Sequence, residues 1–194
     1  MDVNVKIING NWHAGYTLDK HVKSSVFIGD NQYGHPDFDT VRTDVGEAMY
    51  QLKYKNDRKK IPLLVDAFIE NLKSKLSSVG FIVPMPPSKR RVFQPLTELA
   101  KEIAKKMDVP LCENILIKKV RTPQMKDIES IKEKIKVLAT AFSIKDEIVG
   151  EDCWDVLLID DIYGSGTSLN AAALTLKTYS KVNNIYVVAF TRKR

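Results

Sequence analysis

One short segment constrains the fold of this 194-residue chain more than any other. Residues 156–168 begin with four apolar residues, continue with two adjacent aspartates, and end in a turn rich in glycine, serine and threonine, with the sequence VLLIDDIYGSGTS. A continuous apolar run of this length is typical of a strand that is buried on both faces. The residues after the turn, 167–179, have the pattern of a helix. The segment therefore indicates a strand–turn–helix unit of an α/β protein.

From residue 61 onward, helical and strand patterns alternate along the chain. Apolar residues at helical spacing predict helices at 61–76 and 95–107, with a proline near the start of each. Short apolar runs predict strands at 81–83, 115–117, 141–144 and 185–190. Strands that alternate with helices favour a parallel β-sheet flanked by helices, so we expect an α/β fold.

The N-terminal part of the chain has a different character. Five of the nine glycines and all three histidines precede residue 47, and short alternating runs at 3–7 and 25–28 predict strands between turns. The spacing of the histidines matches no metal-ligand pattern. We therefore expect a small N-terminal cap, or hood, at residues 1–55 and a core domain at residues 56–194.

Composition limits the classes of protein to which the chain can belong. The net charge of +6 favours an anionic partner, although it does not distinguish a nucleotide from a nucleic acid. Cys112 and Cys153 are the two cysteines and form no CxxC pair, so neither a disulfide framework nor a cysteine zinc site is supported. The apolar runs are shorter than the roughly 18 residues of a membrane span, and the first ten residues lack the pattern of a signal peptide. We expect a cytoplasmic location and no membrane partner.

The residues after the buried strand suit a sugar phosphate. Ligands of open α/β sheets bind outside the carboxyl ends of the strands. The glycine-rich turn and the helix N-terminus can present N–H groups to a phosphate, and two carboxylates can accept hydrogen bonds from vicinal hydroxyls. The candidate phosphate ligands are Gly164, Ser165, Gly166, Thr167 and Ser168, and the candidate sugar ligands are Asp160 and Asp161.

Three other interpretations of the same residues are weaker. A Walker A loop needs a lysine before the serine or threonine, and this turn has none. A dinucleotide-binding fingerprint needs a third glycine where Leu169 stands. The third interpretation, a polar strand end followed by a helix cap, does not account for two adjacent acids beside a glycine-rich turn.

Segment 156–168 resembles the phosphoribosyl-pyrophosphate (PRPP) motif of type I phosphoribosyltransferases at all 13 positions. The resemblance implies that Asp160 and Asp161 hold the ribose 2′- and 3′-hydroxyls and act in catalysis, and that residues 164–168 bind the 5′-phosphate. It also implies the type I phosphoribosyltransferase fold and a homodimer. The cofactor would be Mg²⁺, held mainly through PRPP rather than by a side-chain motif.

A second resemblance lies upstream. The segments 83–86 (VPMP), 91–93 (RVF) and 99–100 (LA) are similar to a pattern of the ComF-type competence family, a branch of the phosphoribosyltransferases. It implies that the loop after the strand at 81–83 binds pyrophosphate through Met85, Pro86, Pro87, Ser88, Lys89 and Arg91. The alternative interpretation is that these residues form a proline-rich turn that leads into the basic, solvent-exposed start of a helix.

The polar segment 118–136 lies where these enzymes carry a flexible loop that closes over PRPP. In that role, Lys118, Lys119, Arg121 and Lys126 would neutralise the leaving pyrophosphate. The alternative is an ordinary charged surface segment.

Two functional hypotheses follow from these resemblances. The first is an enzyme that transfers the 5-phosphoribosyl group of PRPP to a small nitrogenous acceptor, either a nucleobase or ammonia. The second is a non-catalytic PRPP- or nucleotide-binding module of ComF type with a role in DNA uptake or processing, for which nucleic acid is a possible partner. The general base of purine salvage enzymes does not carry over, because its position is occupied here by Gly164.

Overall fold

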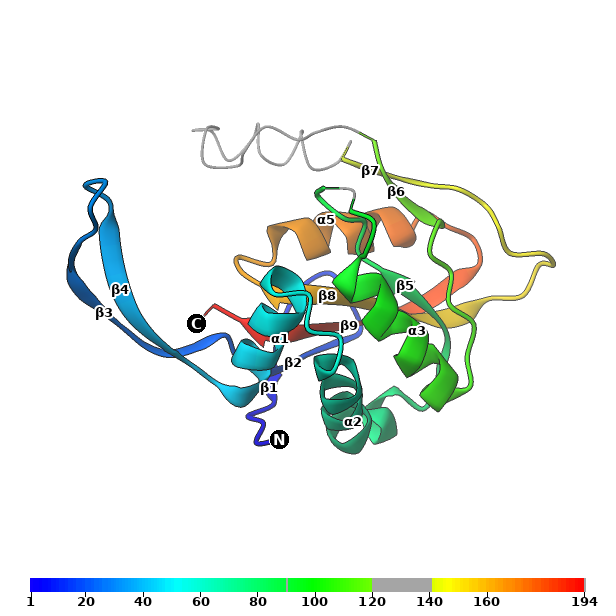
Figure 1. The fold of residues 1–194 in the computed structure, drawn as a ribbon. Helices are drawn as coiled ribbons and strands as arrows, with labels where there is room; N and C mark the ends of the chain where they lie inside the picture. Colours follow the sequence, from blue (N-terminus) through cyan, green and yellow to red (C-terminus); the bar gives the residue numbers. More distant parts are fainter. Residues whose placement is uncertain (90, 120–140, 194) are drawn as a thin grey trace.

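The computed structural model describes residues 1–89, 91–119 and 141–193, and its centre is a five-stranded sheet (Figure 1). The strands, in spatial order, are β1 (Lys6–Ile7), β2 (Ala14–Lys20), β9 (Val182–Arg192), β8 (Trp154–Tyr163) and β5 (Val79–Pro84). Strands β2, β9, β8 and β5 are parallel, and the short edge strand β1 is antiparallel to β2. The predicted parallel sheet is confirmed.

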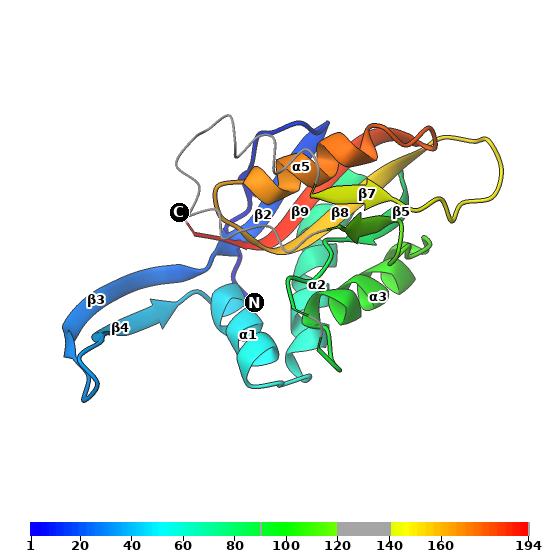
Figure 2. The same cartoon turned by 90° about the horizontal axis from the view of Figure 1, so that it is seen from above.

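Helices cover both faces of the sheet (Figure 2). On one face lie α1 (Asp44–Tyr54), α2 (Lys60–Leu72), the short 3₁₀ helix η1 (Lys73–Leu76) and α3 (Pro95–Met107), and on the other lies α5 (Thr167–Leu176). The helices predicted at 61–76 and 95–107 correspond to α2 with η1 and to α3. None of the helices in the described ranges is long and apolar enough to cross a membrane.

Strand β8 is buried on both faces, as its sequence predicts. Leu157 and Ile159 belong to the hydrophobic cluster under α1, α2 and α3, whereas Val156 and Leu158 belong to the cluster under α5. All four side chains are fully buried. Strands β5 and β9 flank β8, but β5 pairs with it only as far as Ile159, so that among the described strands the residues from Asp160 to Tyr163 pair with β9 alone.

Two expectations for the second half of the chain need correction. Strands β6 (Leu116–Lys118) and β7 (Phe142–Ile144) do not join the parallel sheet but form a separate antiparallel pair, whose buried Leu116 and Phe142 pack into the cluster under α5. Beyond this pair, Lys119 donates a backbone hydrogen bond to Ala141, and residues 120–140 lie outside the described part of the chain. The helix predicted at 167–179 ends at Leu176, because the chain turns there and returns Tyr179 to the same cluster.

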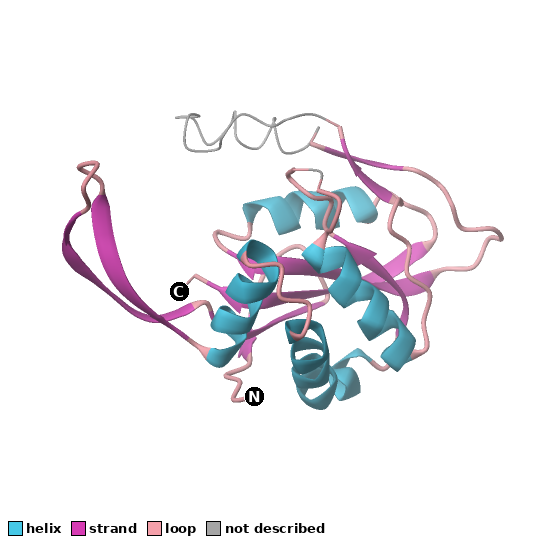
Figure 3. Cartoon of the chain, in the orientation of Figure 1, coloured by secondary structure: helices cyan, strands magenta, loops and turns pink. Residues whose placement is uncertain are grey.

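The N-terminal region contains a strand of the central sheet and a helix, neither of which was predicted from the sequence. Strand β2 lies inside the central sheet, and α1 was not predicted, although Thr43 caps it and acidic residues occupy its first turn. Between them, β3 (Val22–Asp30) and β4 (Pro36–Arg42) form a two-stranded hairpin (Figure 3). The division into a cap at 1–55 and a core at 56–194 stays a prediction.

Candidate functional site

A cavity of about 680 Å³ opens at the carboxyl ends of β5 and β8. It is lined by the end of β8, the turn before α5, the loop after β5, the end of α1 and the end of β6. These segments are far apart in the sequence, and the parallel sheet brings them to one edge. Most of the predicted site residues line it: Asp160, Asp161, Gly164, Ser165, Gly166, Thr167, Ser168, Met85, Pro86, Pro87, Ser88, Lys89, Arg91 and Lys118.

The two aspartates occupy the last part of β8 and are only half-buried. Since side chains alternate along a strand, Asp160 lies on the α5 side of the sheet and Asp161 on the α1 side. The Asp160 carboxylate accepts a hydrogen bond of 2.8 Å from the Asp161 amide. Burial, and then the neighbouring Asp161 carboxylate, raises the pKa of Asp160 well above its usual range. Asp160 is therefore a carboxyl group that holds its proton more tightly than an ordinary surface aspartate.

The turn between β8 and α5 is shaped for close approach to a ligand. Gly166 has a φ of +75°, and a Cβ atom at this position would meet the Tyr163 ring at 2.9 Å. Ser165 and Thr167 share a hydrogen bond of 2.6 Å between their hydroxyls. No described side chain caps the N-terminus of α5, so its first N–H groups face the cavity mouth together with the positive end of the helix dipole. This arrangement suits an anion.

The loop after β5 forms the opposite wall. Met85 is buried and its amide donates a hydrogen bond of 2.8 Å to the Ile159 carbonyl, which fixes the start of the loop to β8. Beyond it, Ser88 and Lys89 are exposed, and the Gln94 side chain donates to the Lys89 carbonyl across 3.2 Å. The Arg91 guanidinium donates to the Lys53 carbonyl across 3.1 Å. The loop is thus held at its root and at its end, with its basic middle toward the cavity.

The site contains residues that sequence patterns did not assign to it. Lys53, near the end of α1, forms an ion pair with Asp161. Tyr54, Gln94, Thr97 and Lys193 also line the cavity. Lys53 was not assigned to the site because the helix that carries it to Asp161 was not predicted, and Lys193 had no signal beyond following the last strand.

Two of the four predicted loop residues can be placed. Lys118 lines the cavity, whereas Lys119 lines an adjacent cavity between β7 and α5, and its amide donates to the Ala141 carbonyl across 2.9 Å. Arg121 and Lys126 lie outside the described residues. The closing role of this segment stays a prediction.

Positive charge predominates around the cavity. Five basic side chains from four different segments line it, against two carboxylates: Lys53, Lys89, Arg91, Lys118 and Lys193. In the described part of the chain, no group of three or more histidine, cysteine, aspartate or glutamate side chains is placed to hold a metal ion. The site is therefore suited to a ligand that carries more than one anionic group and also offers hydroxyls to the aspartates.

Comparison with known proteins identifies the fold. No protein-family model and no curated protein sequence matches the chain. Among solved structures, adenine phosphoribosyltransferase from Trypanosoma brucei, in complex with AMP, pyrophosphate and ribose-5-phosphate, is similar over 100% of this chain and 88% of its own, with a TM-score of 0.52 at 12% identity. Adenine phosphoribosyltransferase from Leishmania tarentolae is similar over 98% and 95%, with a TM-score of 0.51 at 10% identity. The chain has the type I phosphoribosyltransferase fold, as predicted.

Proposed function

We propose that this protein is a phosphoribosyltransferase, which binds PRPP with Mg²⁺ and transfers the 5-phosphoribosyl group to a nitrogen nucleophile with release of pyrophosphate. One observation carries the proposal: a single cavity joins a phosphate-binding turn, two carboxylates and a basic loop. PRPP offers a phosphate, a pair of ribose hydroxyls and a pyrophosphate in the same order. The similar structure from T. brucei contains AMP, pyrophosphate and ribose-5-phosphate, which supports the assignment of the class.

The turn would hold the 5′-phosphate. The N–H groups at the start of α5 and the hydroxyls of Ser165, Thr167 and Ser168 are the donors, and Gly166 gives the turn a positive φ that a side chain against the Tyr163 ring would not fit. Charge-assisted hydrogen bonds of this kind contribute about 1.5–3 kcal/mol each. They fix one end of the substrate and so orient the ribose over β8.

The aspartates would act on the ribose. Asp160 and Asp161 accept hydrogen bonds from the 2′- and 3′-hydroxyls, and the negative charge of Asp161, joined by that of Asp160 when it loses its proton, opposes the positive charge that develops on the ribose ring. In the transfer, the bond between C1 and the pyrophosphate oxygen breaks, and its electron pair leaves with pyrophosphate. The lone pair of the acceptor nitrogen then forms the new bond to C1, and the N–H proton passes to water.

Two groups of donors would hold the leaving pyrophosphate. Lys89 and Arg91 supply charge from the loop after β5, and Lys118 supplies it from the end of β6. Mg²⁺ is usually bound by one or two carboxylates together with substrate phosphates, so the donor set of two aspartates and PRPP oxygens fits this ion. When bound, Mg²⁺ would neutralise the leaving group. Asp160 and Asp161 are the carboxylates within the cavity that could take part.

The decisive experiment measures pyrophosphate release from PRPP and Mg²⁺ across a panel of nucleobases and ammonia. We expect release that depends on one acceptor and is lost in the Asp160→Asn/Asp161→Asn double variant. A parallel calorimetric titration with PRPP measures binding alone. If the protein neither binds PRPP nor releases pyrophosphate, the proposed function is wrong.

A second candidate function is PRPP binding without turnover, in a module of ComF type with a role in DNA uptake or processing. It is favoured by the absence of histidine, glutamate and cysteine among the described residues that line the cavity, which leaves no base for the acceptor beyond the two ribose-binding aspartates. Binding of PRPP without release of pyrophosphate for any acceptor would support it. A DNA-binding role would add an affinity for single strands that falls steeply with salt concentration.

A further inference from the structure

The hairpin β3–β4 projects from the body of the molecule as an arm, which we define as residues 22–42 (Figure 1). Within the described residues, neither of its strands pairs with the central sheet. Both views show it extending away from the helices and the sheet (Figures 1 and 2). A two-stranded hairpin without a packing partner is marginally stable in water. The arm therefore has surface available on both faces.

Large apolar side chains on the arm face solvent. Phe27 and Phe38 are paired across the two strands, with ring centroids 5.7 Å apart, and are 55% and 50% exposed. Tyr33 at the tip is 76% exposed, and Val26 and Val41 are exposed on the opposite face. With about 150–250 Å² for each aromatic side chain, the three rings alone leave roughly 300–400 Å² exposed. The largest apolar patch on a typical monomer is about 300–600 Å² and is often functional, so the arm is a candidate interaction surface.

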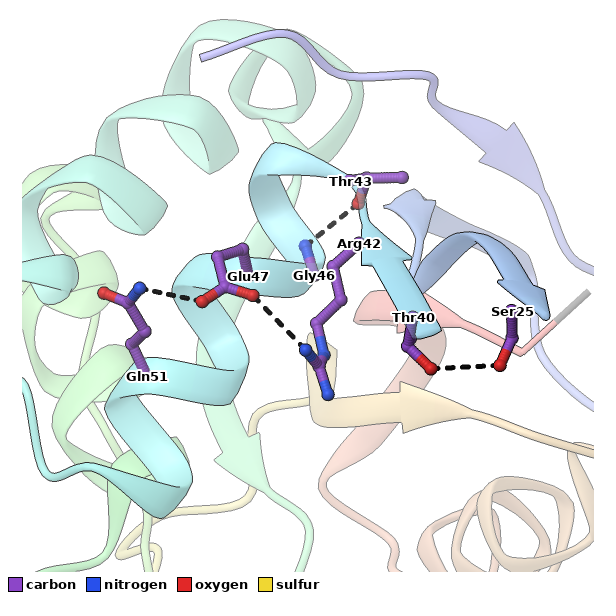
Figure 4. Close-up of polar contacts among 7 residues, drawn as sticks. All are labelled: Ser25, Thr40, Arg42, Thr43, Gly46, Glu47 and Gln51. Atoms are coloured by element: carbon purple, nitrogen blue, oxygen red, sulfur yellow. Dashed lines mark hydrogen bonds and ion pairs between the residues drawn. The ribbon is translucent and has the colours of Figure 1, made fainter. Parts of the chain in front are cut away.

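The root of the arm is attached to α1 by polar contacts of Arg42 and Thr43 (Figure 4). The Thr43 hydroxyl accepts a hydrogen bond of 3.0 Å from the Gly46 amide and donates one of 2.5 Å to the Lys20 carbonyl. The Arg42 guanidinium lies 3.8 Å from the centre of the Tyr50 ring and 3.4 Å from a Glu47 carboxylate oxygen. These contacts fix the direction of the arm relative to α1, so the arm presents a preformed surface.

Charge separates the arm from the rest of the chain. Asp30, Asp37 and Asp39 lie in its distal part, and no lysine or arginine occurs from Ser24 to Val41. The rest of the chain supplies the positive net charge of the protein. A partner surface for the arm should therefore be both apolar and basic.

This chain itself presents such a surface, which we call the basic shoulder: Tyr54, Lys55, Arg58, Lys59 and Val92. All five residues are exposed. The two segments that form the shoulder are in contact, because the Arg58 guanidinium lies 4.5 Å from the centre of the Phe93 ring and Arg91 donates to the Lys53 carbonyl. The shoulder thus offers exposed apolar groups beside three cations.

We propose that the arm docks onto the basic shoulder of a second copy of this chain. A twofold-symmetric dimer forms this contact twice, because each copy supplies one arm and one shoulder. A stable dimer buries about 800 Å² on each partner, so the proposal requires one arm and one shoulder per copy to contribute about this area together. Because Lys53, Tyr54 and Arg91 line the cavity, the docked arm would lie at the mouth of the partner's site. Each site would then be completed by the other copy.

The first test measures the oligomeric state of the whole chain without PRPP, by sedimentation at concentrations up to about 50 µM, where a dimer with a micromolar dissociation constant is populated. We expect a dimer for the wild type and a monomer for the Phe27→Asp/Phe38→Asp variant, with a dissociation constant raised at least about 100-fold. Val149→Asp is the matched control, because Val149 is an exposed apolar residue outside the arm. A monomeric wild type, or an arm variant that stays dimeric, would overturn the proposal.

The second test identifies the receiving surface. Lys55→Glu/Lys59→Glu should weaken the dimer, and so should Asp37→Lys/Asp39→Lys, because each places like charges in the contact. Combining the two pairs in one chain should restore dimerisation. If arm variants dissociate the dimer but the shoulder variant leaves it intact, the shoulder is not the receiving surface. Since no ligand is present, failure here is distinct from failure of the proposed enzymatic function.

Discussion

The cavity and the arm depart from the usual distribution of side chains in opposite directions. At the cavity, Asp160 holds a carboxyl group at the end of a strand whose preceding four residues are fully buried. On the arm, Phe27, Tyr33 and Phe38 leave aromatic rings in water. Both arrangements are unfavourable for the isolated chain. Their remedies differ: a small ligand with hydroxyls and anionic groups suits the cavity, whereas only another macromolecular surface can cover the arm.

The largest effect is expected where the cavity backbone approaches the ligand. Gly166→Val would place a side chain against the Tyr163 ring, at 2.9 Å from the Cβ position, and would displace the turn that faces the phosphate. Loss of two charge-assisted hydrogen bonds weakens PRPP binding by at least about 100-fold. Calorimetry with PRPP and Mg²⁺ measures the affinity.

Gly150→Val is the matched control for this variant. Gly150 also has a positive φ, of +96°, but has no atom within 4 Å of its Cβ position and lies outside the cavity. It should carry a similar backbone strain, without the clash against a neighbouring ring, and should retain its PRPP affinity. Equal PRPP affinity in the wild type and Gly166→Val would remove the turn from the binding site.

The unfavourable setting of Asp160 in the cavity can be tested by measuring how the stability of the protein depends on pH. Because the pKa of Asp160 is higher in the folded protein than the value of about 3.9 for an unfolded aspartate, the folded state retains this proton to higher pH. The free energy of unfolding therefore falls as pH rises from about 4 through the raised pKa. Asp160→Asn should abolish this fall and stabilise the protein at alkaline pH, by about 1.4 kcal/mol for each unit by which the pKa is raised.

Urea titrations at pH 5 and pH 8.5 measure the effect. Asp152→Asn changes an exposed aspartate and should leave the pH dependence as it is in the wild type. If the stability of Asp160→Asn differs between the two pH values by as much as that of the wild type, the folded protein does not raise the pKa of Asp160. The carboxyl group in the cavity would then not be in an unfavourable environment, unlike the exposed rings of the arm.

A smaller effect is expected for the cation that contacts the aspartates. Lys53→Met removes the ion-pair partner of Asp161 and one of the basic groups around the cavity. Both changes increase repulsion of a polyanionic ligand, so PRPP affinity should fall about 10-fold, with a weaker dependence on salt. Lys101→Met, which removes an ion pair on α3, is the control. Unchanged affinity would show that Lys53 contributes structure but no binding.

The smallest effect is expected at the root of the arm. Thr43→Ala removes the N-cap of α1 and the hydrogen bond to the Lys20 carbonyl, which should lower the free energy of unfolding by about 1 kcal/mol. Thr43→Ser retains the hydroxyl and should behave as the wild type. If the Thr43→Ala variant also forms a weaker dimer, the direction of the arm matters as well as its apolar residues.

Much of the fold could be predicted because the apolar positions in the sequence match the faces of strands and helices that are buried in the structure. The run from Val156 to Ile159 is apolar because both faces of β8 are covered, and the stripe of α2 is apolar because one face packs on the sheet. Strand β2 could not be placed, since its neighbour β9 lies at the other end of the chain. The prediction that β6 and β7 belong to the parallel sheet was wrong, because short apolar runs do not reveal with which strand, or in which direction, a strand pairs.

The site was predictable where its residues are consecutive. The turn and its two aspartates are one segment, so the cavity contains them as a unit. Lys53 was not predicted, because an ion pair between α1 and β8 depends on tertiary packing. The exposure of Phe27 and Phe38 was also hidden, because an alternating strand pattern looks the same whether or not its apolar face is covered.

The position of β2 beside β9 has a consequence for how the chain folds during synthesis. Ala14 pairs with Tyr186 and Lys20 with Arg192, so β2 leaves the ribosome long before its neighbouring strand exists. At 5–20 residues per second, that interval is roughly ten seconds or more. Leu18 is fully buried in the finished protein, in a cluster that includes Val188 and Phe190 of β9, and lacks these neighbours throughout the interval. The sheet closes last at its centre, through contacts of high contact order, and a nascent chain must avoid aggregation until then.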